Sequence, residues 1–313
     1  GVRGSYPTPL TTPALQDKLR ALLREATPAD LASAQTIDAL IARSPHARTW
    51  GGNTSCLEVE IDGHVCIFDA GSGIANLSRR IMAAKQHASH GMHLFFTHFH
   101  WDHICGFPFF APIYVPGTEV NLYAGRPDLE RILAVQMNDA HFPAKWDKLP
   151  SRIRCHHLDP AKAHAVAGGT VRLLEMEHPD QAWGYRFEHG GRSVCYLTDT
   201  AVSKNPDRWM AEYCAFVEGA DLVIVDACYG FLAFHEHINF GHSTIFTWID
   251  FFRTSTIGEL VIFHHDPLAD DAALGALLDN ARRYRELIAP EATWKLSAAF
   301  EGQDWSFDAV APT

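Results

Sequence analysis

The sequence predicts a single α/β domain in which two β-sheets are covered by helices. Two observations lead to this fold class. β-Hairpin signals and strand–helix alternation occur in the same chain, and 313 residues can bury one large core. Hydrophobic residues make up 47% of the chain and charged residues 20%, as in ordinary globular proteins. We expect this domain to span residues 1–313.

Two hairpins are predicted from turn residues that separate apolar runs. The first joins TSCLEVEI to HVCIFDA through Asp62-Gly63, and the second joins WGYRFEH to RSVCYLTD through Gly190-Gly191. Other short runs rich in aliphatic and aromatic residues predict strands at MHLFFTH, VNLYAG, TVRLLEM, DLVIVDA and ELVIFHH. Apolar residues at helical spacing predict helices over residues 77–87, 127–137, 243–252 and 271–288.

Residues 12–46 are predicted to form a helical hairpin inserted into the domain. Thr12-Pro13 and Thr27-Pro28 each have the pattern of an N-cap followed by proline, so we expect a helix to begin at each of them. Apolar side chains then repeat at helical spacing: Leu15, Leu19, Leu22, Leu23, Leu31, Ala34, Ile37 and Ile41. The favoured role is packing on the body or on a second subunit, as in a homodimer, and the alternative is an active-site lid.

Charge and cysteine content restrict the partners and the compartment. A formal net charge of −11 disfavours a long nucleic acid, because a grip on the phosphate backbone needs a clustered basic surface. A small anionic substrate is compatible, since bound divalent cations would offset the acidic charge locally. No run approaches the roughly 18 apolar residues of a membrane span, so no membrane partner is expected. The seven cysteines are scattered singly, which favours a reducing cytoplasm.

The stretch THFHWDH, residues 97–103, gathers three histidines and an aspartate directly after a predicted buried strand. Imidazole nitrogen and carboxylate oxygen suit zinc, manganese or iron. His98 and His100 can converge on one ion, while Asp102 and His103 can face a second ion. More groups of the same chemistry stand at the ends of other predicted strands: Asp69, His178, Asp199, His242, His264 and His265. This ordered set predicts a metal site.

The motifs resemble those of the metallo-β-lactamase superfamily, whose hallmark is HxHxDH after a strand, followed by a distant His, Asp and His. Within the superfamily, the chain is most similar to the branch of ribonuclease Z and related small phosphodiesterases. The stretches that carry this similarity are GVRGSYPTP, WGGNTSC, FDAGSG, the hairpin after HPD, GHST and FHHDP. The resemblance implies an αββα sandwich of two mixed sheets covered by helices.

The resemblance also implies a centre of two divalent metal ions, with zinc favoured and manganese or iron as alternatives. The implied ligands are His98, His100 and His178 for the first ion, Asp102, His103 and His264 for the second, and Asp199 as a bridge between them. His265 is the alternative to His264, because both follow the same strand. Asp69 matches an aspartate that supports the metal-binding loop. His156, His157, His235 and His237 match no ligand and are expected to have structural or rim roles.

A hydrolytic mechanism follows from this resemblance. A water or hydroxide bridging the two ions would be the nucleophile, and Asp102 and Asp199 would orient it. His242, in GHST, matches a histidine beside the scissile phosphate, so it would protonate the leaving alkoxide or stabilise the equatorial phosphoryl oxygens. The alternative is that His242 is a helix-start histidine bonded within its own loop.

The implied activity is a phosphodiesterase acting on a small substrate such as a cyclic nucleotide or a cyclic sugar phosphate. An RNA 3′-processing nuclease is an alternative, but only 42 residues separate Asp199 from His242, which leaves no room for a tRNA-binding arm. The same centre could instead hydrolyse a carboxyl ester, lactone or thioester. The least favoured alternative is a non-catalytic metal-binding scaffold.

Overall fold

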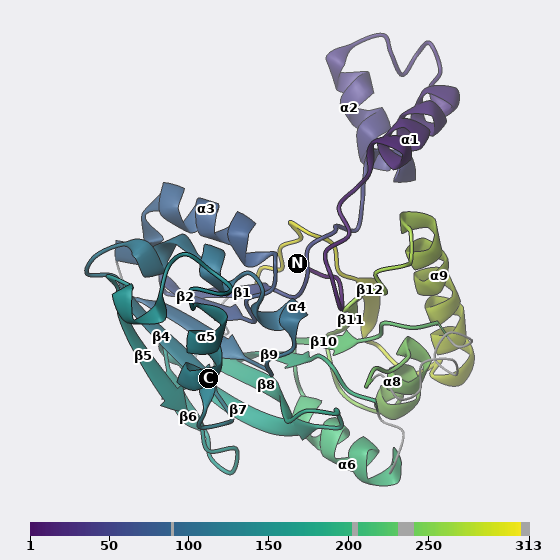
Figure 1. Cartoon of the computed structure of the whole chain (residues 1–313). Helices are drawn as coiled ribbons and strands as arrows, with labels where there is room; N and C mark the ends of the chain where they lie inside the picture. Colours follow the sequence, from purple (N-terminus) through teal and green to yellow (C-terminus); the bar gives the residue numbers. More distant parts are fainter. Residues whose placement is uncertain (89–90, 202–205, 231–240, 308–313) are drawn as a thin grey trace.

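The computed structural model describes residues 1–88, 91–201, 206–230 and 241–307. Two β-sheets pack face to face, and helices cover the outer face of each (Figure 1). This arrangement confirms the predicted αββα sandwich.

The first sheet has five strands in the order β1-β2-β3-β4-β5. Their bounds are β1 Leu57–Ile61, β2 His64–Phe68, β3 Met92–Phe96, β4 Glu119–Ala124 and β5 Arg152–His157. The β1–β2 hairpin turns at Asp62 and Gly63, which have φ of 48° and 81°. This is the turn conformation that an Asp-Gly pair adopts readily. Strands β2 to β5 are parallel, so their carboxyl ends lie at one edge.

The second sheet has seven strands in the order β12-β11-β10-β9-β8-β7-β6. Their bounds are β6 His164–Val166, β7 Gly169–Met176, β8 Ala182–His189, β9 Arg192–Leu197, β10 Leu222–Asp226, β11 Glu259–Phe263 and β12 Lys295–Ala298. Strands β6 to β9 pair antiparallel, and β9 to β12 pair parallel. The predicted hairpin at Gly190-Gly191 joins β8 to β9.

Helices close the sandwich on both sides (Figure 1). On the five-stranded sheet lie α3 (Ile74–Ala84) and α5 (Leu129–Gln136), and on the seven-stranded sheet lie α6 (Pro206–Val217), α8 (Ile245–Phe252) and α9 (Asp271–Ile288). A short helix, α4 (Trp101–Ile104), follows β3. The 3₁₀ turns are Pro45–Ala47, Gln86–Ala88, Phe107–Phe109, Ala111–Tyr114 and Trp146–Lys148. Among the described residues, no helix has both the length and the apolar character that a bilayer crossing requires.

The core between the sheets is built largely from aromatic rings. Phe68 and Phe95 stack with ring centroids 4.9 Å apart, and Tyr185 and Tyr196 pack against Phe68 from the other sheet. All four rings are almost completely buried. Burying an aromatic side chain stabilises a fold by roughly 1.5–3 kcal/mol, so this layer fixes the two sheets relative to each other.

A two-helix arm projects from the body on the side of α9 (Figure 1). It consists of α1 (Thr12–Glu25) and α2 (Ala34–Arg43). Its main polar tie to the body is the Lys18 ammonium, whose Nζ lies 2.7 Å from Asp271 Oδ2 in the first turn of α9. The helices therefore lie within residues 12–46, where the sequence predicts them.

The prediction that the second helix begins at Thr27-Pro28 is wrong. The Thr27 backbone N–H and hydroxyl both donate to Asp30 Oδ2, at 2.9 and 2.8 Å, which closes a turn instead of a helix. The helix begins at Ala34, after a capping box in which Ser33 and Thr36 exchange side chain–backbone hydrogen bonds. This reciprocal cap satisfies two N-terminal groups at once and outcompetes the Thr-Pro signal.

Candidate metal centre

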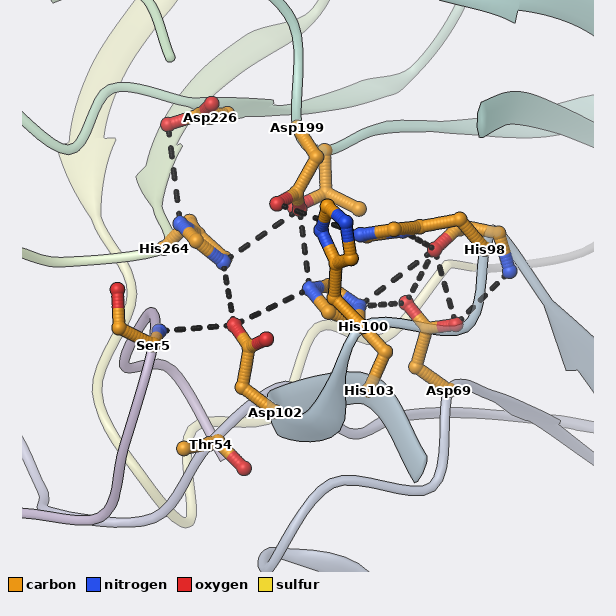
Figure 2. Close-up of polar contacts among 12 residues, drawn as sticks. Ser5, Thr54, Asp69, His98, His100, Asp102, His103, Asp199, Asp226 and His264 are labelled. Carbon is orange, nitrogen blue, oxygen red and sulfur yellow. Dashed lines mark hydrogen bonds and ion pairs between the residues drawn. The ribbon is translucent and has the colours of Figure 1, made fainter. Parts of the chain in front are cut away.

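Several candidate metal ligands, and the supporting Asp69, lie where parallel strands of the two sheets end. Asp69 follows β2, His98 follows β3, Asp199 follows β9, and His264 follows β11. Figure 2 shows these side chains converging between the strand ends. Residues far apart in the sequence therefore meet at one site.

Three of these residues have an unusual backbone. Asp69, Asp199 and His264 have φ of 61°, 57° and 56°, in the left-handed region. Such a conformation costs of order 1–2 kcal/mol per residue, although aspartate and histidine tolerate it better than most. In each case the turn comes directly after a strand. Local strain at three converging positions is typical of a functional site.

The first group of ligands consists of His98, His100 and His178, which bring candidate nitrogen atoms within 4.8 Å of one another. His178 Nδ1–H donates to the carbonyl oxygen of Gly241 at 3.0 Å. The lone pair of a neutral His178 ring is therefore on Nε2, which lies 3.0 Å from His100 Nδ1. Two ring nitrogens that approach this closely can share one cation.

The second group consists of Asp102, His103, Asp199 and His264, whose side chains are all buried. His103 Nε2 lies 3.1 Å from Asp199 Oδ2 and 3.3 Å from Asp102 Oδ2. His264 Nε2 lies 3.1 Å from Asp102 Oδ2 and 3.4 Å from Asp199 Oδ2. Two imidazoles and two carboxylates thus surround one small volume.

Asp199 lies between the two groups. Its Oδ2 faces His103 and His264, while its Oδ1 lies 3.8 Å from His98 Nε2. One carboxylate oxygen is therefore directed to each group. This is the geometry that a bridging ligand needs.

Asp69 orients the second group without facing it. Its Oδ2 accepts from His103 Nδ1–H at 2.8 Å, and Thr97 donates to the same carboxylate through its backbone N–H and its hydroxyl. Tyr196 adds a hydroxyl donor at 3.2 Å. The bond to Nδ1 fixes the His103 tautomer with its lone pair on Nε2, on the side of Asp102 and Asp199.

The donor set fits two divalent cations. The Nε2 atom of His98 is buried and forms no hydrogen bond to any described residue, an arrangement that is costly without a ligand. Burial, followed by the nearby His103, lowers the pKa of His98 well below its usual value. A neutral His98 ring is thus available for coordination.

The carboxylates around the second ligand group stabilise positive charge between them. Burial alone would lower the pKa of His103, but Asp199, Asp102 and Asp69 raise it well above its usual value. Burial would likewise raise the pKa of Asp102, yet the His103 and His264 imidazoles hold it well below the usual range. The pocket therefore holds ionised carboxylates around one stabilised positive charge, which a metal cation can replace.

His264 and His265 point in different directions. His264 faces Asp102 and Asp199, whereas His265 Nε2–H donates to the carbonyl oxygen of Ala299 at 2.7 Å. Burial lowers the pKa of His265 to about 4, so it is a neutral core residue. His264 is therefore the one placed to bind a metal.

His242 lies beside the second group and is paired with Asp226, a residue that the sequence analysis missed. His242 Nδ1 lies 2.9 Å from Asp226 Oδ2, and the His242 ring stacks on His264 with centroids 4.9 Å apart. Asp226 ends β10, and the Cys228 backbone N–H also donates to it. An aspartate closing the buried run LVIVD was the signal, because Asp69 and Asp199 close or follow similar runs.

The remaining histidines lie elsewhere. His156 and His157 are on β5, where His156 stacks on Tyr123 with centroids 4.7 Å apart and its Nε2 bonds to Asn121. His235 and His237 lie outside the described residues.

Comparisons with known proteins place the chain in a family. Residues 64–265 match the model of the beta-lactamase superfamily domain. A ribonuclease Z of Porphyromonas gingivalis is 24% identical over 173 residues, which cover 54% of this chain and 54% of that protein. The chain thus spans about half the length of this curated relative.

Solved structures share the fold at lower sequence identity. The metallo-beta-lactamase fold protein YhfI from Bacillus subtilis is 16% identical, with a TM-score of 0.59 over 81% of this chain and 92% of that one. A diphosphatase from the PhnP family is 17% identical, with a TM-score of 0.57 over 91% of this chain and 92% of that one.

Proposed function

Because the chain belongs to the beta-lactamase superfamily, as its motifs predict, we propose that it is a metal-dependent hydrolase of small phosphodiesters. Its substrate class is the cyclic nucleotide or cyclic sugar phosphate. One observation supports this proposal: the Asp226–His242 pair lies next to the second ligand group. Asp199 belongs to this group and also faces the first one. A proton donor next to a two-ion centre is what cleavage to a poor alkoxide leaving group requires.

Seven side chains would hold two divalent ions, for which zinc is our first choice and manganese or iron the alternatives. They are His98, His100 and His178 for the first ion, Asp102, His103 and His264 for the second, and Asp199 for both. When bound, the ions would lower the pKa of a water molecule and polarise a phosphoryl oxygen. Asp102 and Asp199 would also accept a hydrogen bond from the attacking water and orient it.

His242 would supply the proton that the leaving group needs. The attacking water would lose one proton to the solvent, its oxygen would form a bond to phosphorus as the bond from phosphorus to the leaving oxygen breaks, and the resulting alkoxide would take the proton from His242 Nε2. Asp226 holds the ring by accepting from Nδ1–H, so Nε2 is free to donate. Burial alone would lower the pKa of His242, but Asp226 and Asp199 raise it to about 9. Bound cations would lower this pKa again toward neutrality, where a general acid works best.

A second candidate function is RNA 3′ processing, which the name of the matched Porphyromonas gingivalis relative favours. Two features oppose it. The net charge is −11, and only 42 residues lie between Asp199 and His242. A long RNA needs a broad basic surface, which this acidic chain does not supply.

A hydrolysis screen tests the proposal. Protein loaded with zinc or with manganese is assayed on bis-(p-nitrophenyl) phosphate, cyclic nucleotides, lactones, thioesters and short RNA. We expect turnover of the small phosphodiesters. Turnover of lactones or thioesters alone would replace the proposal with a carboxyl ester hydrolase, and turnover of RNA alone would favour the nuclease. No turnover of any substrate by metal-loaded protein would favour a scaffold.

We also propose that the enzyme works in the reducing cytoplasm. All seven cysteines are free thiols. Burial raises the pKa of the Cys66 and Cys195 thiols to about 12, so these two are inert core residues. Fusion to a fluorescent protein in the host cell checks this location.

A further inference from the structure

We propose that Tyr6 and Trp101 form an aromatic clamp that binds the base of a nucleotide substrate at the mouth of the metal centre. The inference rests on the proposed phosphodiesterase function and narrows its substrate class to phosphodiesters that carry a base. Cyclic sugar phosphates without a base would then be poor substrates.

Among the residues that the structure describes, Trp101 is the most exposed aromatic side chain near the centre. It is 80% exposed, although it lies between His100 and Asp102, which both face the centre. It begins the short helix α4, with its carbonyl oxygen accepting from the Cys105 backbone N–H at 2.7 Å. The Trp101 backbone thus belongs to a hydrogen-bonded helical turn next to two candidate ligands, while its indole is exposed to solvent.

Tyr6 lies in the N-terminal segment, next to a residue that contacts the second ligand group. Its neighbour Ser5 donates a backbone hydrogen bond to Asp102 Oδ2 at 2.8 Å, which Figure 2 shows. Ser5 has a φ of 60°, and the Tyr6 backbone N–H donates to the Gly4 carbonyl oxygen at 2.7 Å. This tight turn fixes the position of Tyr6, whose side chain is 48% exposed.

The two aromatic residues are therefore attached on either side of one hydrogen bond. Tyr6 follows Ser5 and Trp101 precedes Asp102, and consecutive Cα atoms are only about 3.8 Å apart. Stacked rings have centroids roughly 4.5–7 Å apart, and in the proposed clamp a flat base would stack on the indole and the phenol while the phosphate reaches the ligands.

Chemistry favours a base over other occupants. Every base has an apolar face that stacks on indole or phenol without specific hydrogen bonds. A sugar phosphate alone offers only the smaller C–H face of its ring, which has no π-system. The phosphate would lie at the buried cation site and the base at the exposed aromatic rings. A nucleotide has this arrangement, with a charged phosphate at one end and a base with an apolar face at the other.

The test compares one substrate with and without its base. The substrates are 3′,5′-cyclic AMP and the methyl riboside cyclic phosphate, which has a methoxy group in place of adenine. We expect the wild-type protein to prefer cyclic AMP in kcat/KM, mainly through KM. Trp101→Ala should reduce this preference about 10-fold or more, and Trp101→Phe should keep much of it. Tyr6→Ala should act in the same direction.

A binding measurement gives a second readout that does not depend on turnover. Calorimetry measures the affinity of AMP and of ribose 5-phosphate for the metal-loaded protein. Trp101→Ala should weaken AMP binding by a similar factor and affect ribose 5-phosphate much less. The matched control is Leu287→Ala, which removes an apolar side chain that is 79% exposed on α9.

The outcomes separate the clamp from the proposed function. If the wild-type protein hydrolyses neither cyclic substrate, the phosphodiesterase proposal fails, and AMP binding alone decides on the clamp. If Trp101→Ala changes kcat/KM equally for the two cyclic substrates, and changes the affinities for AMP and ribose 5-phosphate equally, the clamp is wrong. A change of oligomeric state in Trp101→Ala, measured by light scattering, would also overturn it, because the ring would then be a contact between copies.

Discussion

In the proposed mechanism, His242 is the residue whose contribution would distinguish phosphodiester cleavage from the hydrolysis of carboxyl esters, lactones or thioesters. His242→Ala should keep both metal ions but lose roughly 100-fold or more in turnover of substrates with alkoxide leaving groups. The loss should be smaller for p-nitrophenolate, which leaves without a proton. Rate measurements on cyclic AMP and bis-(p-nitrophenyl) phosphate, with elemental analysis of the variant, check this.

Asp226→Asn serves as the companion variant, because it weakens the bond that orients His242 and leaves the ring in place. It should give a smaller loss with the same dependence on the leaving group. Equal losses for good and poor leaving groups in His242→Ala would remove it from the acid role. His242 would then position the phosphate or act only in the structure.

Asp69 offers a test of how the metal-binding loop is held. Asp69→Asn preserves the size of the side chain and tolerates the left-handed backbone at φ 61°. It replaces one carboxylate oxygen by an amide, so His103 Nδ1 and Thr97 lose part of their acceptor. We expect metal affinity to fall about 10- to 100-fold. Competition with a chromophoric chelator measures it, and an unchanged affinity would show that Asp69 does not position His103.

Single residues differ in how far the sequence alone predicts them. His98, His100, Asp102 and His103 were predictable because their spacing is local and the preceding buried strand fixes where they lie. Asp226 was missed although it closes a buried run as Asp69 does, because its partner, His242, is sixteen positions away in the sequence. Its role comes from tertiary pairing, which no local pattern encodes.

The same contrast holds for whole elements. Predicted strands such as β3 and β10 are buried over their full length, so they stand out as apolar runs. Strand β5 escaped prediction because it is an edge strand with mostly exposed or half-buried side chains, in the sequence RIRCHH. Strand β12 has only four residues, which is too short for a periodic signal. Both strands form because each pairs with a neighbouring strand through backbone hydrogen bonds.

The arm formed by α1 and α2 carries a prediction at this scale, and we propose that it pairs with a second copy of the chain. Leu15, Leu19 and Leu23 are exposed at spacing i, i+4, i+8 on α1, and no residue of α1 is buried. Such a stripe is symmetric about Leu19, so two antiparallel copies place Leu15 opposite Leu23 and Leu19 opposite Leu19. A self-complementary surface of this kind suits a twofold dimer.

Leu19→Glu tests the pairing, because it places two like charges face to face at the centre of the stripe. We expect the wild-type protein to be a dimer by light scattering and the variant to be a monomer with an unchanged circular dichroism spectrum. Leu287→Glu on α9 is the control and should remain dimeric. A monomeric wild-type protein, or a dimeric variant, would reject the arm as the interface.

At the scale of the whole molecule, the strand ends of both sheets bring the candidate ligands together. We expect two bound cations to occupy the space between these ligands. We predict about two transition-metal ions per chain, measured by elemental analysis of the purified protein. Asp199→Asn should lower the occupancy of both ions, because Asp199 directs one oxygen to each ligand group. Asn also tolerates the φ of 57° at this position, so the backbone should be preserved. One ion per chain in active protein would contradict the two-ion centre.

Metal binding should also stabilise the fold, since the ligands come from the ends of strands in both sheets. A ligand present at 1,000 times its Kd stabilises the folded state by about 4 kcal/mol. Adding a chelator at pH 7.5 should therefore lower the Tm clearly. The difference should shrink at pH 5.5, because protons compete with metal for the imidazole ligands as the pH falls. Differential scanning calorimetry measures all four conditions. An unchanged Tm after addition of the chelator would contradict this prediction. It would mean that the charges of the carboxylates and imidazoles stabilise each other without metal.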